Sequence, residues 1–216
     1  DLDASGCEGY PLIVQIFSAH NSPPKSGDED LPIPPVELID YSDAPDSYGT
    51  LLASDGARHY IVPNGPVLGA GVDAEADGQP NSTATGDDLL DGNNDNDGVV
   101  FPTDLVSGQE ASVQVTGTAG AKLDAWIDWN GNGVFDEGER IAISFELTGG
   151  ADVLTFTVPV DAVEGDTYAR FRVSSAGGLA PTDLALDGEV EDYLVDPHGP
   201  TAVTLSAFEA TPAEGA

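Results

Sequence analysis

The sequence has very few basic residues, with six Lys and Arg against 39 Asp and Glu in 216 residues and a formal net charge of −33. Nucleic-acid binding is excluded, because a phosphate backbone needs a basic surface. A single cysteine, Cys7, excludes a disulfide within the chain. No apolar run approaches the roughly 18 residues of a membrane-spanning helix. We therefore expect neither disulfides nor a membrane span to stabilise this acidic chain.

The residues that are abundant favour a β-rich fold. Hydrophobic residues make up 40% of the chain, and 26 Gly and 16 Pro favour short strands and turns over long helices. Apolar and polar residues alternate with period two in several segments, which is typical of strands. The segments are 113–115, 123–129, 141–147, 154–158, 169–173 and 190–195. They predict an all-β fold, an antiparallel β-sandwich of jelly-roll-like or Ig-like type with long acidic calcium-binding loops.

The alternation also predicts which side chains face the core. Leu123, Ala125, Ile127 and Trp129 share one face, so Trp129 is expected to point inward and Trp126 outward. In the next segment, the expected inward face comprises Ile141, Ile143, Phe145 and Leu147.

Composition divides the chain into three parts. Residues 1–39 hold an apolar strand candidate, Leu12–Phe17, and a Pro-rich linker. Residues 40–196 form the predicted sandwich. Residues 197–216 hold a second linker and another strand candidate, Val203–Phe208, which is either the start of a further module or a strand donated to another chain.

The strongest motif lies at residues 128–139, which match the calcium-loop pattern Asp-x-Asn-x-Asn-Gly-x5-Glu. Its expected ligands are Asp128, Asn130, Asn132, the Val134 carbonyl, Asp136 and Glu139. A ligand set made of oxygens suits Ca²⁺. The alternative is an ion-free Asn-Gly hairpin turn, although such a turn has no use for three carboxylates.

A second acidic region runs from Asp73 to Asp104, with nine acidic residues and no Lys or Arg. Oxygen-bearing side chains stand at every second position at Asp91, Asn93, Asp95 and Asp97, which again favours calcium. Asp73 and Asp77 repeat the spacing more weakly. The alternative for this region is a solvated loop of like charge.

A third acidic cluster lies at residues 187–193. If it is a strand, Glu189 and Glu191 share one face and Asp192 lies on the other. These carboxylates either complete an ion shell or pair with arginines of a neighbouring strand, Arg170 and Arg172.

Several short motifs together resemble a known family. They are residues 40–50, 56–59, 72–80, 97–101, 123–131, 168–172 and 188–192, the last of which reads Gly-Glu-Val-Glu-Asp. Taken in order, they resemble the GEVED domain of large bacterial secreted and cell-surface proteins over about residues 40–196. The resemblance implies an extracellular β-rich module within longer architectures, and it does not imply an activity.

Motifs of catalysis are scarce. The sequence contains no Gly-x-Ser-x-Gly and no His-Glu-x-x-His, and His59, which precedes an apolar segment, is expected to be structural. With 39 acidic residues, some carboxylate pair will fall at a glycosidase-like separation by chance, so such a pair carries no argument. We therefore expect no enzyme.

The sequence favours a calcium-stabilised structural or adhesive module, with other copies of itself or neighbouring domains of a longer surface protein as partners. Apolar strand candidates near both ends are compatible with a filament assembled by strand donation. The alternative function is a calcium-dependent carbohydrate-binding module of a secreted hydrolase, with glycans as partners. Asn81 begins an Asn-Ser-Thr glycosylation sequon, so the protein could also carry sugar.

Overall fold

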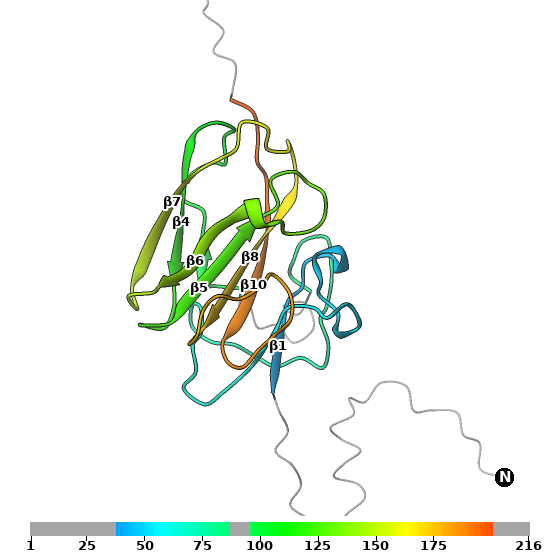
Figure 1. The fold of residues 1–216 in the computed structure, drawn as a ribbon, viewed down its shortest axis with the longest axis vertical. Coiled ribbons are helices and arrows are strands. Elements are labelled where there is room, and N and C mark those ends of the chain that lie inside the picture. Colours follow the sequence, from blue (N-terminus) through cyan, green and yellow to red (C-terminus); the bar gives the residue numbers. More distant parts are fainter. Residues whose placement is uncertain (1–37, 87–95, 201–216) are drawn as a thin grey trace, which may run out of the picture. The chain divides into compact units, whose positions relative to one another are not determined.

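A computed structural model of the chain describes residues 38–86 and 96–200. These residues form ten β-strands and three short 3-10 helices, and they contain no α-helix (Figure 1). The strands are β1 Ile39–Tyr41, β2 Arg58–Tyr60, β3 Val99–Val100, β4 Glu110–Thr116, β5 Lys122–Ile127, β6 Arg140–Glu146, β7 Ala151–Thr157, β8 Thr167–Ser174, β9 Leu184–Ala185 and β10 Glu189–Val195. The 3-10 helices are η1 Asp46–Tyr48, η2 Leu52–Ser54 and η3 Glu137–Glu139. All six strands expected from alternation are present, and the all-β prediction is confirmed.

Two antiparallel sheets form the two layers of a sandwich. One has the strand order β10-β8-β5-β6 and the other β3-β4-β7. Their facing side chains enclose the main hydrophobic core, which includes Val113 and Val115 of β4, Leu154 of β7, and Phe171 of β8. Burial of these apolar side chains stabilises the sandwich, because each removes its surface from water.

Strand β5 lies in the middle of the four-stranded sheet, between β8 and β6. Leu123, Ala125 and Ile127 point into the main core, and Trp129 beyond the strand end joins them, as expected. Trp129 packs against Phe156 of the opposite sheet, with ring centroids 5.8 Å apart. The period-two prediction for this strand is therefore confirmed.

Strand β6 departs from the expected alternation. Ile143 is 67% exposed, whereas Ala142 is buried. The reason is an extra residue in β6: Leu123 pairs with Phe145, but Ala125 pairs with Ala142. Ser144 takes up the irregularity with φ +46°, and the bulge moves the following side chains to the other face. The predicted inward face of Ile141, Ile143, Phe145 and Leu147 is wrong for Ile143 and Phe145, which are exposed.

A third layer covers the outer face of the four-stranded sheet. The small sheet β1-β2-β9 and the segment around η1 belong to this layer, and β1 and β2 contact β10. Trp126 points to this outer face, as its alternation requires, but it is only 1% exposed because Ala44, Tyr48 and Phe135 pack around it. The expectation that Trp126 faces solvent is therefore wrong.

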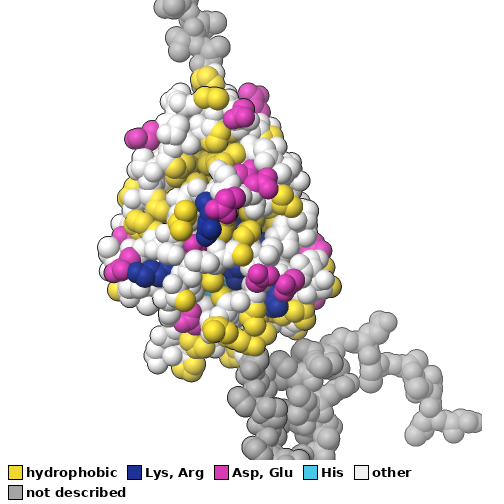
Figure 2. All heavy atoms as spheres, in the orientation of Figure 1, with side chains coloured by type: hydrophobic (Ala, Val, Ile, Leu, Met, Phe, Trp, Pro, Cys, Tyr) yellow, Lys and Arg dark blue, Asp and Glu magenta, His cyan; other side chains and the backbone are white. Residues whose placement is uncertain are grey.

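Three features of the sequence lie outside the described residues: the strand candidates Leu12–Phe17 and Val203–Phe208, and Cys7. Among the described helices, none is long and apolar enough to cross a membrane. On the face in Figure 2, the few Lys and Arg side chains lie beside acidic ones. Ion pairs join Lys122 to Glu146 and Arg140 to the buried Asp124.

Candidate cation-binding loop and buried ionic network

The loop at residues 128–139 connects β5 to β6 and curls around the carboxylate of Asp128. One carboxylate oxygen, Oδ1, accepts hydrogen bonds from the backbone N–H groups of Gly131 at 2.7 Å and Asn132 at 3.3 Å. The other, Oδ2, accepts from the N–H of Gly133 at 2.9 Å. Gly131 and Gly133 have φ of +66° and +86°, so glycine lets the chain make this tight curl without a steric penalty.

The side chains of Asn130, Asn132 and Asp136 converge on one point of the loop. Both amide groups donate to Asp136 Oδ2, at 3.3 Å from Asn130 and 2.9 Å from Asn132. An amide turned by 180° presents its oxygen where its nitrogen was, with almost the same shape. In this structure the two amide oxygens accept from backbone N–H groups, Asn130 Oδ1 from Asn132 at 2.9 Å and Asn132 Oδ1 from Val134 at 3.0 Å, so such a turn would also have to replace these two bonds.

Glu139 occupies the last position of the motif but has a different role in this structure. Its Oε1 accepts from the N–H groups of Trp129 and Asn130, and its Oε2 from that of Asp136, in the capping box of η3. Burial raises the pKa of this carboxyl above its ordinary value, and the backbone hydrogen bonds oppose that shift. Glu139 therefore stabilises the loop through hydrogen bonds to both of its carboxylate oxygens.

The loop combines buried carboxylates with oxygen-bearing amide side chains. Asp128 is fully buried and Glu139 is 5% exposed, yet no ion pair found in the described part of the chain includes either of them. Buried carboxylates need compensation, and here only hydrogen-bond donors supply it. Asp128, Asn130, Asn132 and Asp136 are oxygen-bearing side chains of the kind that Ca²⁺ prefers. Carboxylates alone do not make the site, because no group of three or more His, Cys, Asp or Glu among residues 38–86 and 96–200 is arranged to hold a metal.

In the second acidic region, Asp97 is described, whereas Asp91, Asn93 and Asp95 lie outside the described residues. Asp97 Oδ1 accepts from the N–H of Ala70 at 2.8 Å, and its own N–H donates to Glu191. Asp97 thus ties the segment before β3 to the rest of the fold, and the predicted calcium loop at 91–97 stays a prediction.

In the weaker repeat at Asp73 and Asp77, Asp77 and the intervening Glu75 accept hydrogen bonds from backbone N–H groups. Asp77 Oδ1 accepts from the N–H groups of Leu52 at 2.7 Å and Gly78 at 2.9 Å. Glu75, between them, reaches the N–H of Tyr41 at 2.9 Å. Asp77 and Glu75 hold different segments of the outer layer, and the calcium site at Asp73 and Asp77 stays a prediction.

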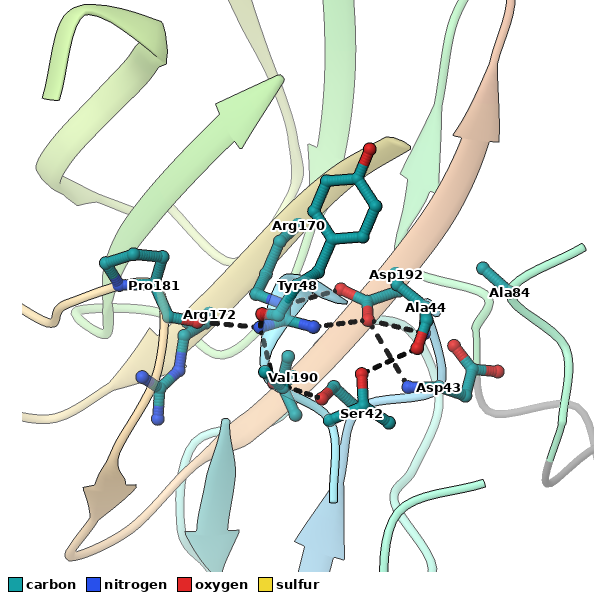
Figure 3. Close-up of polar contacts among 12 residues, drawn as sticks. Ser42, Asp43, Ala44, Tyr48, Ala84, Arg170, Arg172, Pro181, Val190 and Asp192 are labelled. Carbon is teal, nitrogen blue, oxygen red and sulfur yellow. Dashed lines mark hydrogen bonds and ion pairs between the residues drawn. The ribbon is translucent and has the colours of Figure 1, made fainter. Parts of the chain in front are cut away.

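Strand β10 contains residues 189–192 of the Gly-Glu-Val-Glu-Asp motif. Its Asp192 forms a fully buried ion pair with Arg170 of β8 (Figure 3). Arg170 Nε and Nη2 each donate at 2.8 Å to one carboxylate oxygen. Its Nη1 donates to the carbonyls of Tyr48, Gly49 and Pro181 in the outer layer. Of the alternatives for Asp192, the ion pair across the sheet is the one present.

Arg172 is buried beside this pair, and its hydrogen-bond acceptors include His59 and backbone carbonyls. Its Nε donates to His59 Nε2 at 3.0 Å, and its other nitrogens donate to backbone carbonyls such as that of Asp183. Burial lowers the pKa of Arg172 to about 9, and the nearby Arg170 adds to the effect. Because a guanidinium only donates, His59 must carry its proton on Nδ1, which lies 2.8 Å from the Asp187 carbonyl. His59 is structural, as predicted.

Glu189 and Glu191 point from β10 to the opposite side. Glu189 Oε2 accepts from the N–H of Leu68 at 2.6 Å. Glu191 Oε1 accepts from the N–H groups of Asp97 at 3.0 Å and Gly98 at 2.8 Å. Burial raises the pKa of Glu191 to about 7. Both glutamates hold loops that precede β4.

Two partners of the network were not found by sequence reasoning. Tyr48 donates its hydroxyl to Asp128 Oδ2 at 2.7 Å, and Asp40 Oδ2 accepts from the N–H of Val190 at 2.7 Å. Both residues lie 80 or more positions from their partners, so no local spacing could indicate the contact. The one available signal was their membership of the 40–50 motif.

A cavity of about 250 Å³ lies beside the loop. It is lined by residues 46–49, Ser54, residues 134–135 and residues 181–182. Ser54 Oγ donates to Asp46 Oδ2 at 2.8 Å within this wall. The lining combines hydroxyl groups, one carboxylate and apolar surface.

The fold and the loop define an all-β sandwich module with a buried ionic core and an acidic loop suited to a hard cation. Residues 122–196 match the family model of the GEVED domain. The predicted GEVED domain is confirmed over these residues, which run from β5 through β10. Neither the curated proteins nor the solved structures contain a significant match to this chain.

Proposed function

We propose that this chain is a non-enzymatic, calcium-stabilised structural or adhesive module of a bacterial surface or secreted protein. The observation that carries the proposal is Asp128, a fully buried carboxylate with no cationic partner among the described residues, at the first position of an oxygen-rich loop. A bound Ca²⁺ would compensate this charge and supply a fixed link between β5 and β6. Asp128, Asn130, Asn132, Asp136 and the Val134 carbonyl would hold it.

An extracellular location is part of the proposal. The GEVED match over residues 122–196 supports it, since that domain is expected in secreted and surface proteins. Calcium sites of extracellular modules bind in the range of about 10⁻⁴–10⁻³ M. A chain with a net charge of −33 would gain most from cations where calcium is plentiful.

The absence of an enzymatic role is also proposed. The buried arginines of the described network are occupied by Asp192 and by backbone carbonyls, and His59 is held between Arg172 and the Asp187 carbonyl. These side chains serve the folded structure and do not face a substrate site.

Thermal unfolding in millimolar calcium against a chelator tests the proposal. We expect a higher midpoint in calcium, because a ligand that binds the folded state stabilises it by RT ln(1 + [L]/Kd), about 2.7 kcal/mol at 100 times Kd. Asp128→Asn should remove most of this gain. Asp104→Asn, at an exposed position outside the loop, is the matched control. Coincident curves for the wild-type chain would overturn the proposal.

Assembly through strand donation is a further part of this proposal. Strand β7 pairs with β4 on one side, and within residues 38–86 and 96–200 no strand pairs with its other side. Its one charged residue, Asp152, is buried, so the edge lacks the charges that usually block pairing. The uncharged segment Leu12–Phe17 of a second copy is the proposed donor. Light scattering measures the size of the full chain, of a variant lacking residues 1–20 and of Val153→Lys. A polymer that both variants lose supports strand donation. A full chain that stays monomeric contradicts it.

The cavity beside the loop favours one second candidate, a calcium-dependent carbohydrate-binding module. Its volume of about 250 Å³ suits a single sugar ring rather than a drug-sized ligand. The platform of exposed tryptophans that such modules often use is missing, since Trp126 and Trp129 are buried. A glycan array with and without chelator distinguishes the two: reproducible calcium-dependent binding favours this candidate over the structural one.

A further inference from the structure

The carboxylate of Asp128 receives one hydrogen bond from outside its own loop. Three of its donors in the described structure are backbone N–H groups of the loop, at Gly131, Asn132 and Gly133. The fourth is the Tyr48 hydroxyl, which lies 80 residues earlier in the chain and donates to Asp128 Oδ2 at 2.7 Å. Tyr48 also lies outside residues 122–196, the part that matches the family.

The position of that hydroxyl is fixed from several sides. The Tyr48 ring packs on Phe135 of the loop and on Tyr168 of β8, with both centroid distances at 4.9 Å. Its carbonyl accepts from Arg170 Nη1 at 2.8 Å, and the residue is 6% exposed. The Tyr48 hydroxyl is therefore a rigid donor, held by the outer layer and by the sheet together.

Tyr48 contacts the loop at two positions. The hydroxyl holds Asp128, the first residue of the motif, and the ring holds Phe135, the eighth. A donor fixed in this way selects one orientation of the Asp128 carboxylate before any cation arrives. Outer partners that orient metal ligands in this manner typically change metal affinity by 10- to 100-fold when removed.

We propose that Tyr48 is a positioning residue for Asp128, and that cation binding at the 128–139 loop and packing of residues 44–50 on the sheet stabilise each other. The inference rests on the proposed calcium binding of this loop. Coupling between two such events is reciprocal: if docked Tyr48 raises the affinity for calcium, calcium must favour docked Tyr48 by the same factor. The outer layer thus sets the calcium affinity of a loop that belongs to the family-matched part of the chain.

Calcium titration by calorimetry of Tyr48→Phe tests the first half. The substitution keeps the ring and removes the hydroxyl, so we expect calcium to bind the loop about tenfold more weakly. Tyr168→Phe is the matched control, because its hydroxyl donates to the Ser82 carbonyl at 3.0 Å and not to the loop. Asp128→Asn identifies which binding step belongs to the loop. Equal affinity of Tyr48→Phe and wild type for that step would overturn the inference while leaving calcium binding intact.

Hydrogen exchange of the wild-type protein tests the second half and does not depend on a variant that folds. Calcium is expected to slow exchange in residues 44–50, where the Tyr48 and Gly49 N–H groups are bonded to Pro45 and Asp46, as well as in the loop. Strand β7, in the opposite sheet, is the internal reference. Slower exchange in 128–139 with no change in 44–50 would overturn the coupling. No calcium effect in calorimetry or exchange would overturn the proposed function itself, and this inference with it.

Discussion

At the scale of single residues, the fold depends on charged side chains that are fully enclosed. Asp192 and Arg170 share two hydrogen bonds of 2.8 Å with neither side chain exposed. Removing one partner of such a pair typically costs about 3–5 kcal/mol, since the other charge is left uncompensated. Arg170 also binds three carbonyls of the outer layer, so this residue connects that layer to the four-stranded sheet.

The buried histidine makes stability depend on pH. Burial and the neighbouring Arg172 lower the pKa of His59 well below its ordinary value. The unfolded chain takes up a proton on this ring below about pH 6.5, while the folded chain does not, so stability is present above that pH and lost as the pH falls. The expected loss is at most about 1.4 kcal/mol for each pH unit below 6.5.

The pH dependence of stability is compared between the wild type and His59→Gln. Gln is a neutral side chain that can accept a hydrogen bond from Arg172 and donate one to the Asp187 carbonyl. Urea unfolding in chelator at pH 7.5 and 5.5 measures the two slopes. The wild type should lose more stability between these pH values than the variant does. Parallel pH profiles would show that His59 titrates normally in the folded protein, against this prediction.

At the scale of elements, the bulge in β6 decides which side chains are buried and so contribute to the free energy of unfolding. Ile143 and Leu123 belong to neighbouring strands and both fit the apolar period of their segments. Leu123 is fully buried, whereas Ile143 is 67% exposed beside the positive φ of Ser144. The N–H of Ser144 donates to buried Asp124 at 3.0 Å, which holds the bulge in place.

Alanine substitutions separate the two positions. Leu123→Ala should lower the free energy of unfolding by about 2–5 kcal/mol, because it removes buried methyl groups and leaves a cavity. Ile143→Ala should change it by no more than about 0.5 kcal/mol, as for other exposed sites. Denaturant melts under identical conditions give both values, and a large loss for Ile143→Ala would mean that β6 has its alternation restored in solution.

At the scale of the whole molecule, the family-matched part lacks many of its packing partners. Residues 122–196 contain β10, but the N–H groups bound by Glu189, Glu191 and Asp192 belong to residues 43–44, 68 and 97–98. Strand β4, which pairs with β7 over its full length, also precedes the match. Isolated, this part would lose these backbone donors and the strand that neighbours β7.

We therefore expect a fragment of residues 122–196 to lack a cooperative unfolding transition, whereas residues 38–200 should unfold cooperatively. Circular dichroism with thermal melts in calcium measures both. The reason is that the fragment keeps the buried carboxylates of β10 and loses the backbone N–H groups of residues 43–44, 68 and 97–98 that bind them. A cooperative melt of the short fragment would mean that the outer layer is an accessory to a self-sufficient sandwich.

The sequence by itself determined the strands and the motif loop, because both are encoded locally. Period two in β5, β7 and β8 reflects the strand geometry itself. The spacing of residues from Asp128 to Glu139 gives a loop that turns at its glycines, independently of the surrounding structure. The GEVED resemblance, assembled from short motifs, also needed no structure to be found.

Only the tertiary structure decided what these elements face. Alternation placed Trp126 and Arg170 on the outer side of the sheet, but it carries no information on whether that side meets water or a third layer. The layer comes from residues 38–60 and 179–185, whose strands are too short to show a period. The same holds for Tyr48 and Asp128, since a hydrogen bond across 80 residues depends on how the layers pack and leaves no trace in local spacing.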